Sequence, residues 1–219
     1  MDLPPRKYGR GLFLATVAGG ISSLAWGKSV WGHVASAVPS VPLAPSGWRI
    51  YTVAATMPTF DAATWKLEVG GLVDHPLTLS YDELRALPRT AQVRDFHCVT
   101  GWSVSNVRWT GVRLSDLFDR VGPKRGALGV RFESAEIPYV DYLTYDQAVL
   151  RDVMLAYEMD GKPLPREHGA PVRLVMPEMY GYKSVKWVSR VDLVDDAYDG
   201  YWEQLGYDRD AWVGRSNGL

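Results

Sequence analysis

The chain has 219 residues, of which 47% are hydrophobic and 22% are charged. Its 24 Lys and Arg side chains nearly balance its 25 Asp and Glu side chains, which leaves a formal net charge of −1. These values are typical of a globular domain and argue against a disordered chain. Near-zero charge also argues against broad attraction to nucleic acid or to an anionic membrane surface. We therefore expect a small molecule or a protein as the partner.

The N-terminal segment differs in composition from the rest of the chain. Residues 4–10 are basic, residues 11–27 carry no charge, and residues 35–37 are small. This order is typical of an export signal, and the apolar run is short for a bilayer span, which needs about 20 residues. The stretch "RGLFL" resembles the twin-arginine export motif, with Gly11 at the second arginine position. We expect an export signal or N-terminal anchor over residues 1–37, and thus a periplasmic or envelope-associated protein; a buried helix is the alternative.

Residues 38–47, "VPSVPLAPSG", form a Pro- and Ser-rich linker. Repeated proline cannot continue a helix or a central strand, so the linker separates the N-terminal segment from the folded part. We expect one domain over residues 48–219, which is an ordinary size for a single domain.

Short strand and helix signals alternate in the first half of this domain. Residues 64–69 alternate between apolar and charged side chains, as a half-buried strand does. Ser80 and Glu83 form a capping box ahead of a short helix, because each side chain can satisfy a free backbone donor. Residues 114–122, "LSDLFDRVG", predict a helix that ends at Gly122.

The second half continues the pattern. Thr144 and Gln147 form a second capping box, and the Asp160-Gly161 pair between two apolar runs predicts a hairpin turn. The segment "PVRLVM" and the alternating residues 184–194 predict further strands. The sequence contains no glycine-rich phosphate loop of the dinucleotide or P-loop type. Many short strands with a few short helices predict a compact, β-rich α+β domain.

The only cysteine, Cys98, lies in the stretch "HCVTGWS". A lone cysteine is most often a small buried hydrophobic residue. Here, however, Thr100, Gly101 and Ser103 are small and turn-prone, and they leave room for a bulky group near the backbone. A single thiolate can bind a transition metal whose other ligands come from elsewhere, including an organic cofactor.

Three stretches carry a resemblance to a known family. "FHCVTGWS", "VRWTGVRLSDLF" and "MLAYEMDGKPLPREHGAPVRLVMPEMYGYKSVKWV" resemble the molybdenum–molybdopterin domain of the sulfite oxidase family. They are most similar to its short bacterial members and to the periplasmic methionine-sulfoxide reductase catalytic subunit, over about residues 48–207. The resemblance implies a mixed, β-rich fold of the sulfite oxidase type. It also implies that Cys98 binds molybdenum, while the dithiolene of the pterin supplies two more sulfur ligands.

The resemblance implies further site residues. Arg173 matches an arginine used on the pterin and its phosphate, and an arginine fork suits a buried phosphate. Tyr139 matches the tyrosine near the metal and would be a hydrogen-bond donor to the substrate or oxo group. His97 is expected to contact the pterin or to orient the cysteine loop. The other implied cofactor-binding positions are Tyr51, Thr52, Ser134, His168, Ser184, Val185 and Lys186.

Each of these residues also has an ordinary structural alternative: an exposed charge, a turn cap or a core aromatic. Thr52, Ser134 and His168 stand where the family has glutamate, threonine and asparagine. Trp102, Trp109 and Trp187 are assigned to the core. The aromatic C-terminal residues are expected to pack back on the core, with Trp202 and Trp212 facing a partner as the alternative.

The implied activity is oxygen-atom transfer with two electrons on a small oxyanion or sulfoxide. The sequence has no CxxCH motif and no cysteine set for an iron–sulfur cluster. We therefore expect no haem and no iron–sulfur centre in this chain, and a separate electron-transfer protein or membrane haem subunit as partner. Thr100 replaces the glutamate of the reductases, which puts the sulfoxide activity in doubt. The C-terminal dimerisation domain of true sulfite oxidases has no counterpart, so the oligomeric state is left open.

Two alternatives to a molybdenum enzyme follow from the same residues. A cofactor-free binding module would fold without metal but would bury Arg173 without a partner, which is costly. A thiol enzyme would use Cys98 as nucleophile beside His97. Adjacent residues of an extended chain point to opposite faces, which argues against that pair.

Overall fold

The computed structural model describes residues 47–217. The expected export signal and all of the expected linker except Gly47 lie outside the described residues. No helix within residues 47–217 is long and apolar enough to cross a membrane. The folded part begins with Trp48, which is buried.

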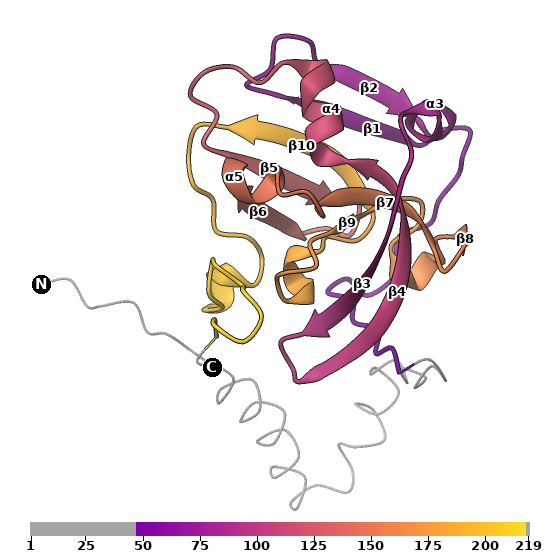
Figure 1. The fold of residues 1–219 in the computed structure, drawn as a ribbon, viewed down its shortest axis with the longest axis vertical. Coiled ribbons are helices and arrows are strands. Elements are labelled where there is room, and N and C mark those ends of the chain that lie inside the picture. Colours follow the sequence, from indigo (N-terminus) through magenta and orange to yellow (C-terminus); the bar gives the residue numbers. More distant parts are fainter. Residues whose placement is uncertain (1–46, 218–219) are drawn as a thin grey trace, which may run out of the picture.

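Two five-stranded sheets form the body of the molecule (Figure 1). The first sheet has the order β2-β1-β10-β5-β6, in which β1 and β10 are parallel and the other neighbours are antiparallel. Its strands are β1 (Lys66–Gly71), β2 (Leu77–Ser80), β5 (Gly129–Ser134), β6 (Val140–Thr144) and β10 (Val188–Val194).

The second sheet has the order β3-β4-β7-β8, and β9 also pairs with β7. All of its pairs are antiparallel. The long hairpin of β3 and β4 extends away from the first sheet, as Figure 1 shows, and its turn follows Cys98. The strands are β3 (Thr90–Cys98), β4 (Trp102–Arg113), β7 (Met154–Met159), β8 (Lys162–Pro163) and β9 (Arg173–Val175).

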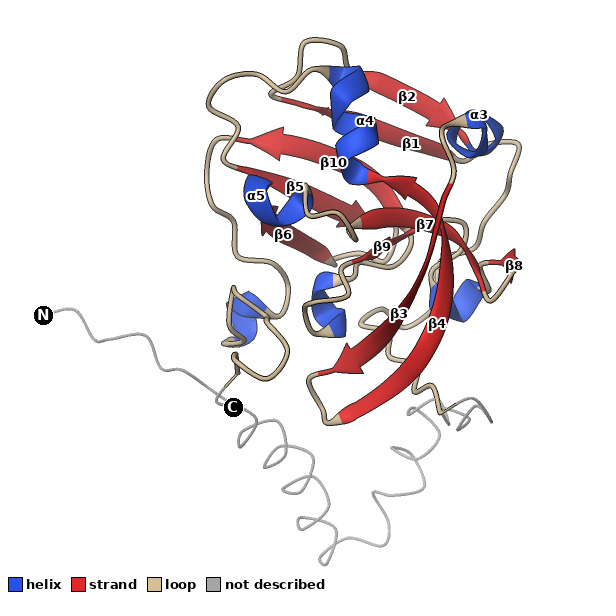
Figure 2. Cartoon of the chain, viewed as in Figure 1, coloured by secondary structure: helices blue, strands red, loops and turns tan. Residues whose placement is uncertain are grey.

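The helices are short and few among the described residues, so strands dominate the view in Figure 2. Helices α3 (Tyr81–Ala86) and α5 (Tyr145–Ala148) begin with the two predicted capping boxes, both of which are present. Helix α4 (Leu114–Val121) ends at Gly122 as predicted, with a φ of 64° that suits glycine. Three single-turn 3₁₀ helices follow: η2 (Arg166–His168), η3 (Gly181–Lys183) and η4 (Glu203–Leu205).

The predicted hairpin is confirmed. Asp160 and Gly161 join β7 to β8 with φ angles of 53° and 76°, and two positive φ values define the turn that asparagine or aspartate followed by glycine prefers. A β-rich mixed fold with two sheets and few helices agrees with the fold class expected from the sequence.

One strand prediction is wrong in extent. The alternating residues 184–194 do not form one strand, because β10 begins only at Val188. Trp187 has a φ of 51° and its amide donates to the Gly169 carbonyl at 3.3 Å, so the chain turns out of the extended conformation just before the sheet. Residues 184–186 therefore lie in a loop and not on a strand face.

Two hydrophobic clusters fill the interior. The larger cluster includes Leu67, Phe132 and Val191 of the first sheet together with Phe118 of α4. The smaller lies under the β3–β4 hairpin and includes Trp48, Trp109 and Met154. Trp109 and Trp187 are core residues, as predicted, whereas Trp102 is only partly buried.

The C-terminal residues pack back on the core, as expected. Tyr180 donates its amide to the Ala211 carbonyl at 2.8 Å, and the Tyr182 hydroxyl donates to the Asp208 carbonyl at 2.7 Å. A buried ion triad also holds this segment: Lys183 Nζ lies 2.5 Å from both Asp141 Oδ1 and Glu203 Oε1. We call residues 198–217 the C-terminal segment.

Candidate active site

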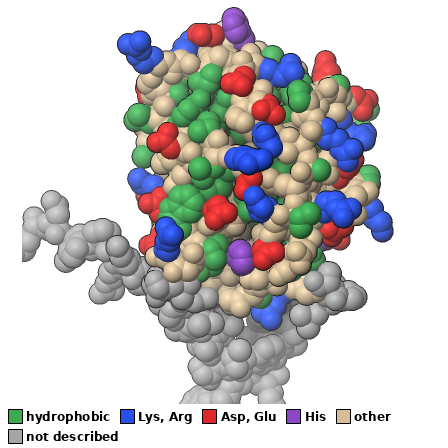
Figure 3. Space-filling view, viewed as in Figure 1, with side chains coloured by type: hydrophobic (Ala, Val, Ile, Leu, Met, Phe, Trp, Pro, Cys, Tyr) green, Lys and Arg blue, Asp and Glu red, His purple; other side chains and the backbone are tan. Residues whose placement is uncertain are grey.

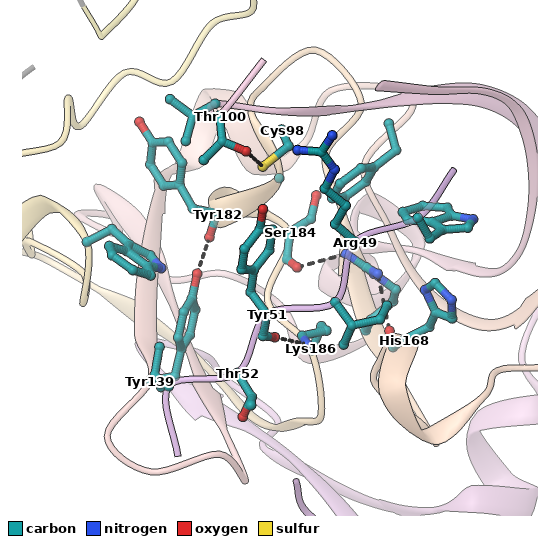
Figure 4. Close-up of a pocket in the computed structure, with 18 of the residues that line it drawn as sticks. Arg49, Tyr51, Thr52, Cys98, Thr100, Tyr139, His168, Tyr182, Ser184 and Lys186 are labelled. Carbon is teal, nitrogen blue, oxygen red and sulfur yellow. Dashed lines mark hydrogen bonds between the residues drawn. The ribbon is translucent and has the colours of Figure 1, made fainter. Parts of the chain in front are cut away.

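A pocket lies between the tip of the β3–β4 hairpin, residues 48–53, helices η2 and η3, and the C-terminal segment. It encloses about 920 Å³ of space, open solvent at its mouth included. Figure 4 shows Cys98 and Thr100 at one end of the pocket and His168 and Lys186 towards the other. On the face shown in Figure 3, acidic and basic side chains are interspersed over the surface.

Cys98 ends β3 and pairs with Trp102, the first residue of β4. A three-residue turn joins them, in which Gly101 has a φ of 94° and donates its amide to the Cys98 carbonyl at 3.0 Å. The Cys98 Sγ atom lies 3.1 Å from the Thr100 hydroxyl. The turn thus presents a half-buried sulfur to the pocket with a hydroxyl beside it.

Arg173 lies on β9 at the base of the pocket and is 3% exposed. Its guanidinium donates to the carbonyls of His168 at 3.2 Å and Ser184 at 3.1 Å, and it lies over the ring of Phe96 at 5.4 Å. Within residues 47–217 it forms no ion pair with a carboxylate. Burial lowers the pKa of Arg173 to about 10, while the neighbouring Tyr139 raises it. The positive charge is therefore buried without a negative partner among the described residues.

Lys186 adds a second positive charge. Its Nζ atom donates to the Tyr51 carbonyl at 2.6 Å and lies 4.1 Å from the centre of the Trp187 ring. Burial lowers its pKa to about 7, an effect that Glu136 opposes and Arg173 reinforces. The backbone amides of Val185 and Lys186 donate to no other described residue. Both cations therefore line the same pocket, and the two available amides lie in the loop that carries Lys186.

His168 lies in η2 beside this cationic group. Gly169, which follows it, has a φ of 108°, and a Cβ atom there would lie 2.9 Å from the Lys186 Cβ atom. Only glycine lets the two segments approach so closely. Burial first, and then the charges of Arg173 and Lys186, lower the pKa of His168 to about 3. Its imidazole is therefore neutral at pH 7 and can donate one hydrogen bond.

Glu136 fixes the segment that crosses the mouth of the pocket. This carboxylate is 3% exposed, and its Oε1 atom accepts hydrogen bonds from the Thr52 hydroxyl, the Val53 amide at 2.7 Å and the Ala54 amide at 3.3 Å. Lys186 holds the same segment through the Tyr51 carbonyl. Tyr51 and Thr52 are thus placed on the pocket by side chains far away in the sequence.

The Cys98 end of the pocket is aromatic. Tyr139, Tyr182, Trp202 and Tyr207 line it, the last two from the C-terminal segment. The Tyr139 hydroxyl donates to the Tyr182 carbonyl at 2.6 Å. Burial, then the charge of Asp141, raises the pKa of Tyr139 well above its usual value, so this phenol stays protonated. The pocket therefore has a cationic end and an aromatic end that holds the sulfur.

Most of the residues expected from the sequence meet at this pocket. Tyr51, Thr52, Cys98, Tyr139, His168, Arg173, Ser184 and Lys186 line it. Three expected residues do not. His97 bonds Ser103 at 2.8 Å through Nδ1; the Ser134 hydroxyl donates to the Lys186 carbonyl at 2.7 Å; and Val185 is buried behind the wall.

Several residues that line the pocket carry no signal of a site in the sequence. Glu136 and Tyr207 come from loops and Trp202 precedes η4, where no periodic pattern marks them. Arg49 follows the expected domain start and lies at the mouth, exposed. The aromatic residues near the C-terminus were the one available signal. They predicted that this segment packs on the core, but they did not predict that it lines a pocket.

The cationic end fits a ligand that bears a phosphate. Arg173 and Lys186 have only carbonyl acceptors as close partners among the described residues, and the amides of Val185 and Lys186 have none. Arg173 is a buried charge without a counter-charge, which is costly, so an anion in the pocket would stabilise it. The opposite end offers one soft sulfur ligand of the kind that transition metals accept. The donor set therefore fits an organic anion that carries a metal.

The chain belongs to the family described as "oxidoreductase molybdopterin binding domain", whose model matches residues 54–202. The family expected from the sequence is thereby confirmed.

Several known proteins are similar to this chain. An uncharacterised oxidoreductase, YuiH of Bacillus subtilis, is 40% identical over 147 residues, which are 67% of this chain and 74% of YuiH. The protein-methionine-sulfoxide reductase catalytic subunit MsrP of Xanthomonas axonopodis is 34% identical over 67% of this chain, and the match spans 50% of that protein. A putative subunit of such a reductase, YedZ1 of Azospira oryzae, is 36% identical over 71% of this chain and 58% of its own length.

Among solved structures, the sulfane dehydrogenase SoxCD of Paracoccus pantotrophus matches with a TM-score of 0.62 and 27% identity. The match covers 66% of this chain and 42% of that chain. This chain therefore spans about half of the named reductase subunit and less than half of the matched SoxCD chain.

Proposed function

We propose that this chain binds molybdenum–molybdopterin and catalyses oxygen-atom transfer on a small sulfur-containing or similar substrate. Cys98 is the protein ligand to molybdenum, at the aromatic end of the pocket. Arg173, Lys186 and the amides beside it bind the phosphate end of the cofactor. When bound, this cofactor supplies two-electron oxygen-atom transfer, which protein side chains alone do not.

The observation that carries the proposal is a pair of cations in the pocket, Arg173 and Lys186, which bond carbonyl oxygens but form no ion pair with a carboxylate among the described residues. Arg173 is buried on β9 and donates only to carbonyls. A planar guanidinium can give two parallel, charge-assisted hydrogen bonds to a phosphate, and Lys186 supplies a second charge nearby. The cysteine at the other end determines how the cofactor is oriented: its phosphate lies at Arg173 and Lys186, and its metal lies at Cys98.

The other residues orient the cofactor and exclude water. Neutral His168 can donate one hydrogen bond to the cofactor, while Glu136 and Lys186 hold Tyr51 and Thr52 across the mouth. The Thr100 hydroxyl can donate to the sulfur of Cys98. The hydrogen-bonding role expected of Tyr139 stays a prediction; its hydroxyl donates to a carbonyl in this structure.

The substrate is either a sulfoxide or a sulfite-like oxyanion. The aromatic wall of Tyr182, Trp202 and Tyr207 favours a neutral sulfoxide, whose substituents pack on rings. Arg49 at the mouth favours the oxyanion. Assays with dimethyl sulfoxide and with sulfite, each at equal enzyme concentration, decide between them.

We further propose a separate electron-transfer partner, either a soluble protein or a membrane haem subunit. Two similar proteins are named as subunits of a reductase, which supports a partner for this chain as well. The basic, apolar and small-residue pattern of residues 1–37 supports export to the periplasm or cell envelope.

Cofactor content tests the phosphate end of the site. The wild-type chain is purified from a host that makes molybdopterin, and the pterin is released, oxidised and measured by fluorescence. Arg173→Met is expected to retain less than about a tenth of the wild-type pterin, because the guanidinium fork is lost. Arg173→Lys keeps the charge without the fork and is expected to lie between the two.

Arg209→Met is the matched control, since Arg209 is exposed and pairs only with Asp199 on the surface. It is expected to keep the wild-type pterin content. Equal pterin in the folded Arg173→Met and wild-type proteins would contradict the proposed phosphate site. Folded wild-type protein without pterin, from a host that loads a known relative, would favour the cofactor-free binding module.

A further inference from the structure

Four tyrosines line the pocket, and their hydroxyl groups are used differently. Tyr139 donates to the Tyr182 carbonyl at 2.6 Å, and Tyr182 donates to the Asp208 carbonyl at 2.7 Å. Neither Tyr51 nor Tyr207 has a hydrogen-bond partner for its hydroxyl within residues 47–217. Tyr51 is 46% exposed and belongs to the segment already proposed to bind the cofactor. Tyr207 is more buried and has no role yet.

The ring of Tyr207 is held in place from two sides. It lies edge-on to the Tyr182 ring at 5.4 Å and against the Trp202 ring at 5.2 Å, measured between ring centres. Its amide donates to the Trp202 carbonyl at 3.1 Å. These two ring contacts and the amide bond restrict where the hydroxyl can lie, and a tyrosine hydroxyl in a pocket usually bonds a partner there. A ligand in the pocket can supply that partner.

The backbone on both sides of Tyr207 is also anchored. Asp208 donates its amide to Asn217 Oδ1 at 3.1 Å, and Asn217 Nδ2 donates to the Tyr182 hydroxyl at 3.0 Å. On the other side, Glu203 forms the buried ion pair with Lys183. The C-terminal segment therefore positions Tyr207 through several bonds to η3 and its neighbours.

Tyr207 lies at the Cys98 end of the pocket. Both residues line it, together with Thr100 and Trp202. A phenol hydroxyl is a hydrogen-bond donor at neutral pH, and this one belongs to a residue that lines the same pocket as the sulfur.

We propose that Tyr207 is a catalytic residue whose hydroxyl donates a hydrogen bond to the oxygen atom of the substrate at the Cys98 end of the pocket. The shared chemistry is an oxygen bonded to sulfur, in a sulfoxide or in a sulfite-like oxyanion. The inference rests on the proposed molybdenum function. It gives the donor role to the C-terminal segment and leaves Tyr139 as a wall residue.

The test uses Tyr207→Phe in the molybdenum-loaded full chain, because phenylalanine keeps the ring contacts and removes only the hydroxyl. Two turnover assays are run: reduction of dimethyl sulfoxide with a reduced viologen dye, and oxidation of sulfite with ferricyanide. Molybdenum content is measured on the same samples. We expect full molybdenum and a fall of about 10²–10³-fold in kcat/KM on whichever probe is turned over, which is the cost of removing one transition-state donor in well-studied enzymes.

Tyr145→Phe is the matched control, because Tyr145 lies on α5, packs on Phe118 and is remote from the pocket lining. Its kcat/KM is expected to stay at the wild-type value, because Tyr145 does not line the pocket and its change removes no contact to the substrate. A second measurement is the electron paramagnetic resonance spectrum of Mo(V) with dimethyl sulfoxide or sulfite added. We expect Tyr207→Phe to change this spectrum and Tyr145→Phe to leave it unchanged.

The possible results distinguish the role of Tyr207 from the proposed molybdenum function. Wild-type turnover and an unchanged spectrum in fully loaded Tyr207→Phe would overturn the role of Tyr207 and leave the molybdenum function standing. Loss of molybdenum in Tyr207→Phe would also overturn it, since the residue would then only hold the cofactor. Absence of molybdenum from the wild type would overturn both. If neither probe is turned over, the spectrum alone decides.

Discussion

At the scale of single residues, the pocket is organised by charges that lack carboxylate partners. Arg173 and Lys186 lie close to its base, and neutral His168 lies beside them. Each of these residues would cost free energy in a protein whose pocket held only water. Their pKa values, all lowered first by burial, record that cost.

Lys186 gives a pH dependence with a definite sign. Its pKa is about 7 in the folded cofactor-free chain and about 10.4 in the unfolded chain, so the unfolded chain binds more protons between these values. The free energy of unfolding should therefore rise with pH from 7 to about 10, by at most about 1.4 kcal/mol per pH unit from this group. Denaturant titrations of wild type and Lys186→Met, without cofactor, measure the difference.

Lys162→Met serves as the control, because Lys162 is exposed on β8. The gain in wild-type stability relative to Lys186→Met should appear only above pH 7. Parallel curves for wild type and Lys186→Met across this range would show that Lys186 keeps an ordinary pKa.

Tyr139 provides a second residue-scale prediction. Because its hydroxyl donates to the Tyr182 carbonyl, Tyr139→Phe removes one internal hydrogen bond. We expect a loss of about 0.5–1.5 kcal/mol in the free energy of unfolding, with kcat/KM changed far less than in Tyr207→Phe. Urea unfolding and the two turnover assays measure these quantities. A larger loss of turnover in Tyr139→Phe than in Tyr207→Phe would return the donor role to Tyr139.

Sequence patterns predicted part of this site. Cys98, Arg173 and Lys186 stand in contiguous motifs, so a resemblance could assign them before the fold was known. Tyr207 and Glu136 carry no such signal. They reach the pocket because the C-terminal segment and the loop after β5 fold onto it, and contacts between segments far apart in the sequence have no local pattern.

At the scale of elements, local chemistry predicted short elements well and one long strand badly. Two capping boxes and the Asp160-Gly161 turn satisfy backbone groups within a few residues, so neighbouring residues determine them. The alternation over residues 184–194 is a weaker signal. Backbone hydrogen bonds to Gly169 and Val172 turn the chain before Val188, and Ser184 and Lys186 line the pocket as a result.

The buried triad is the strongest polar link between elements near the pocket. Lys183 of η3 bonds Asp141 of β6 and Glu203 of η4 at 2.5 Å each. Burial lowers the pKa of Lys183, but the two carboxylates raise it more, so the net shift is upward. Gly200 is required beside them, since a Cβ atom there would lie 2.7 Å from Glu203 Oε2.

Lys183→Met should therefore be strongly destabilising, because it leaves two carboxylates buried together. We expect a loss of about 3–5 kcal/mol in the free energy of unfolding, the usual result when one partner of a buried pair is removed. Guanidinium unfolding at neutral pH measures it, with the exposed Lys124→Met as control. A loss below about 1 kcal/mol would contradict this expectation. It would mean that water enters beside the two carboxylates, or that one of them takes up a proton, and so removes their repulsion.

At the scale of the whole molecule, the β3–β4 hairpin, β9 and the anchored C-terminal segment surround a pocket that is cationic at one end and aromatic, with the Cys98 sulfur, at the other. The cationic base comes from β9 and the loop before β10, and the sulfur comes from the turn of the β3–β4 hairpin. This division suits a long anionic cofactor that carries its metal at one end. The family match over residues 54–202 covers almost all of these elements.

Molybdenum content tests the central claim most directly. Wild type and Cys98→Ser are purified from a host that makes molybdopterin, and metal is measured by inductively coupled plasma mass spectrometry beside the pterin assay. We predict near-stoichiometric molybdenum in wild type and little in Cys98→Ser, because serine replaces the soft thiolate ligand. Equal molybdenum in both proteins would contradict the role of Cys98. Absence of molybdenum from folded wild type would contradict the function itself.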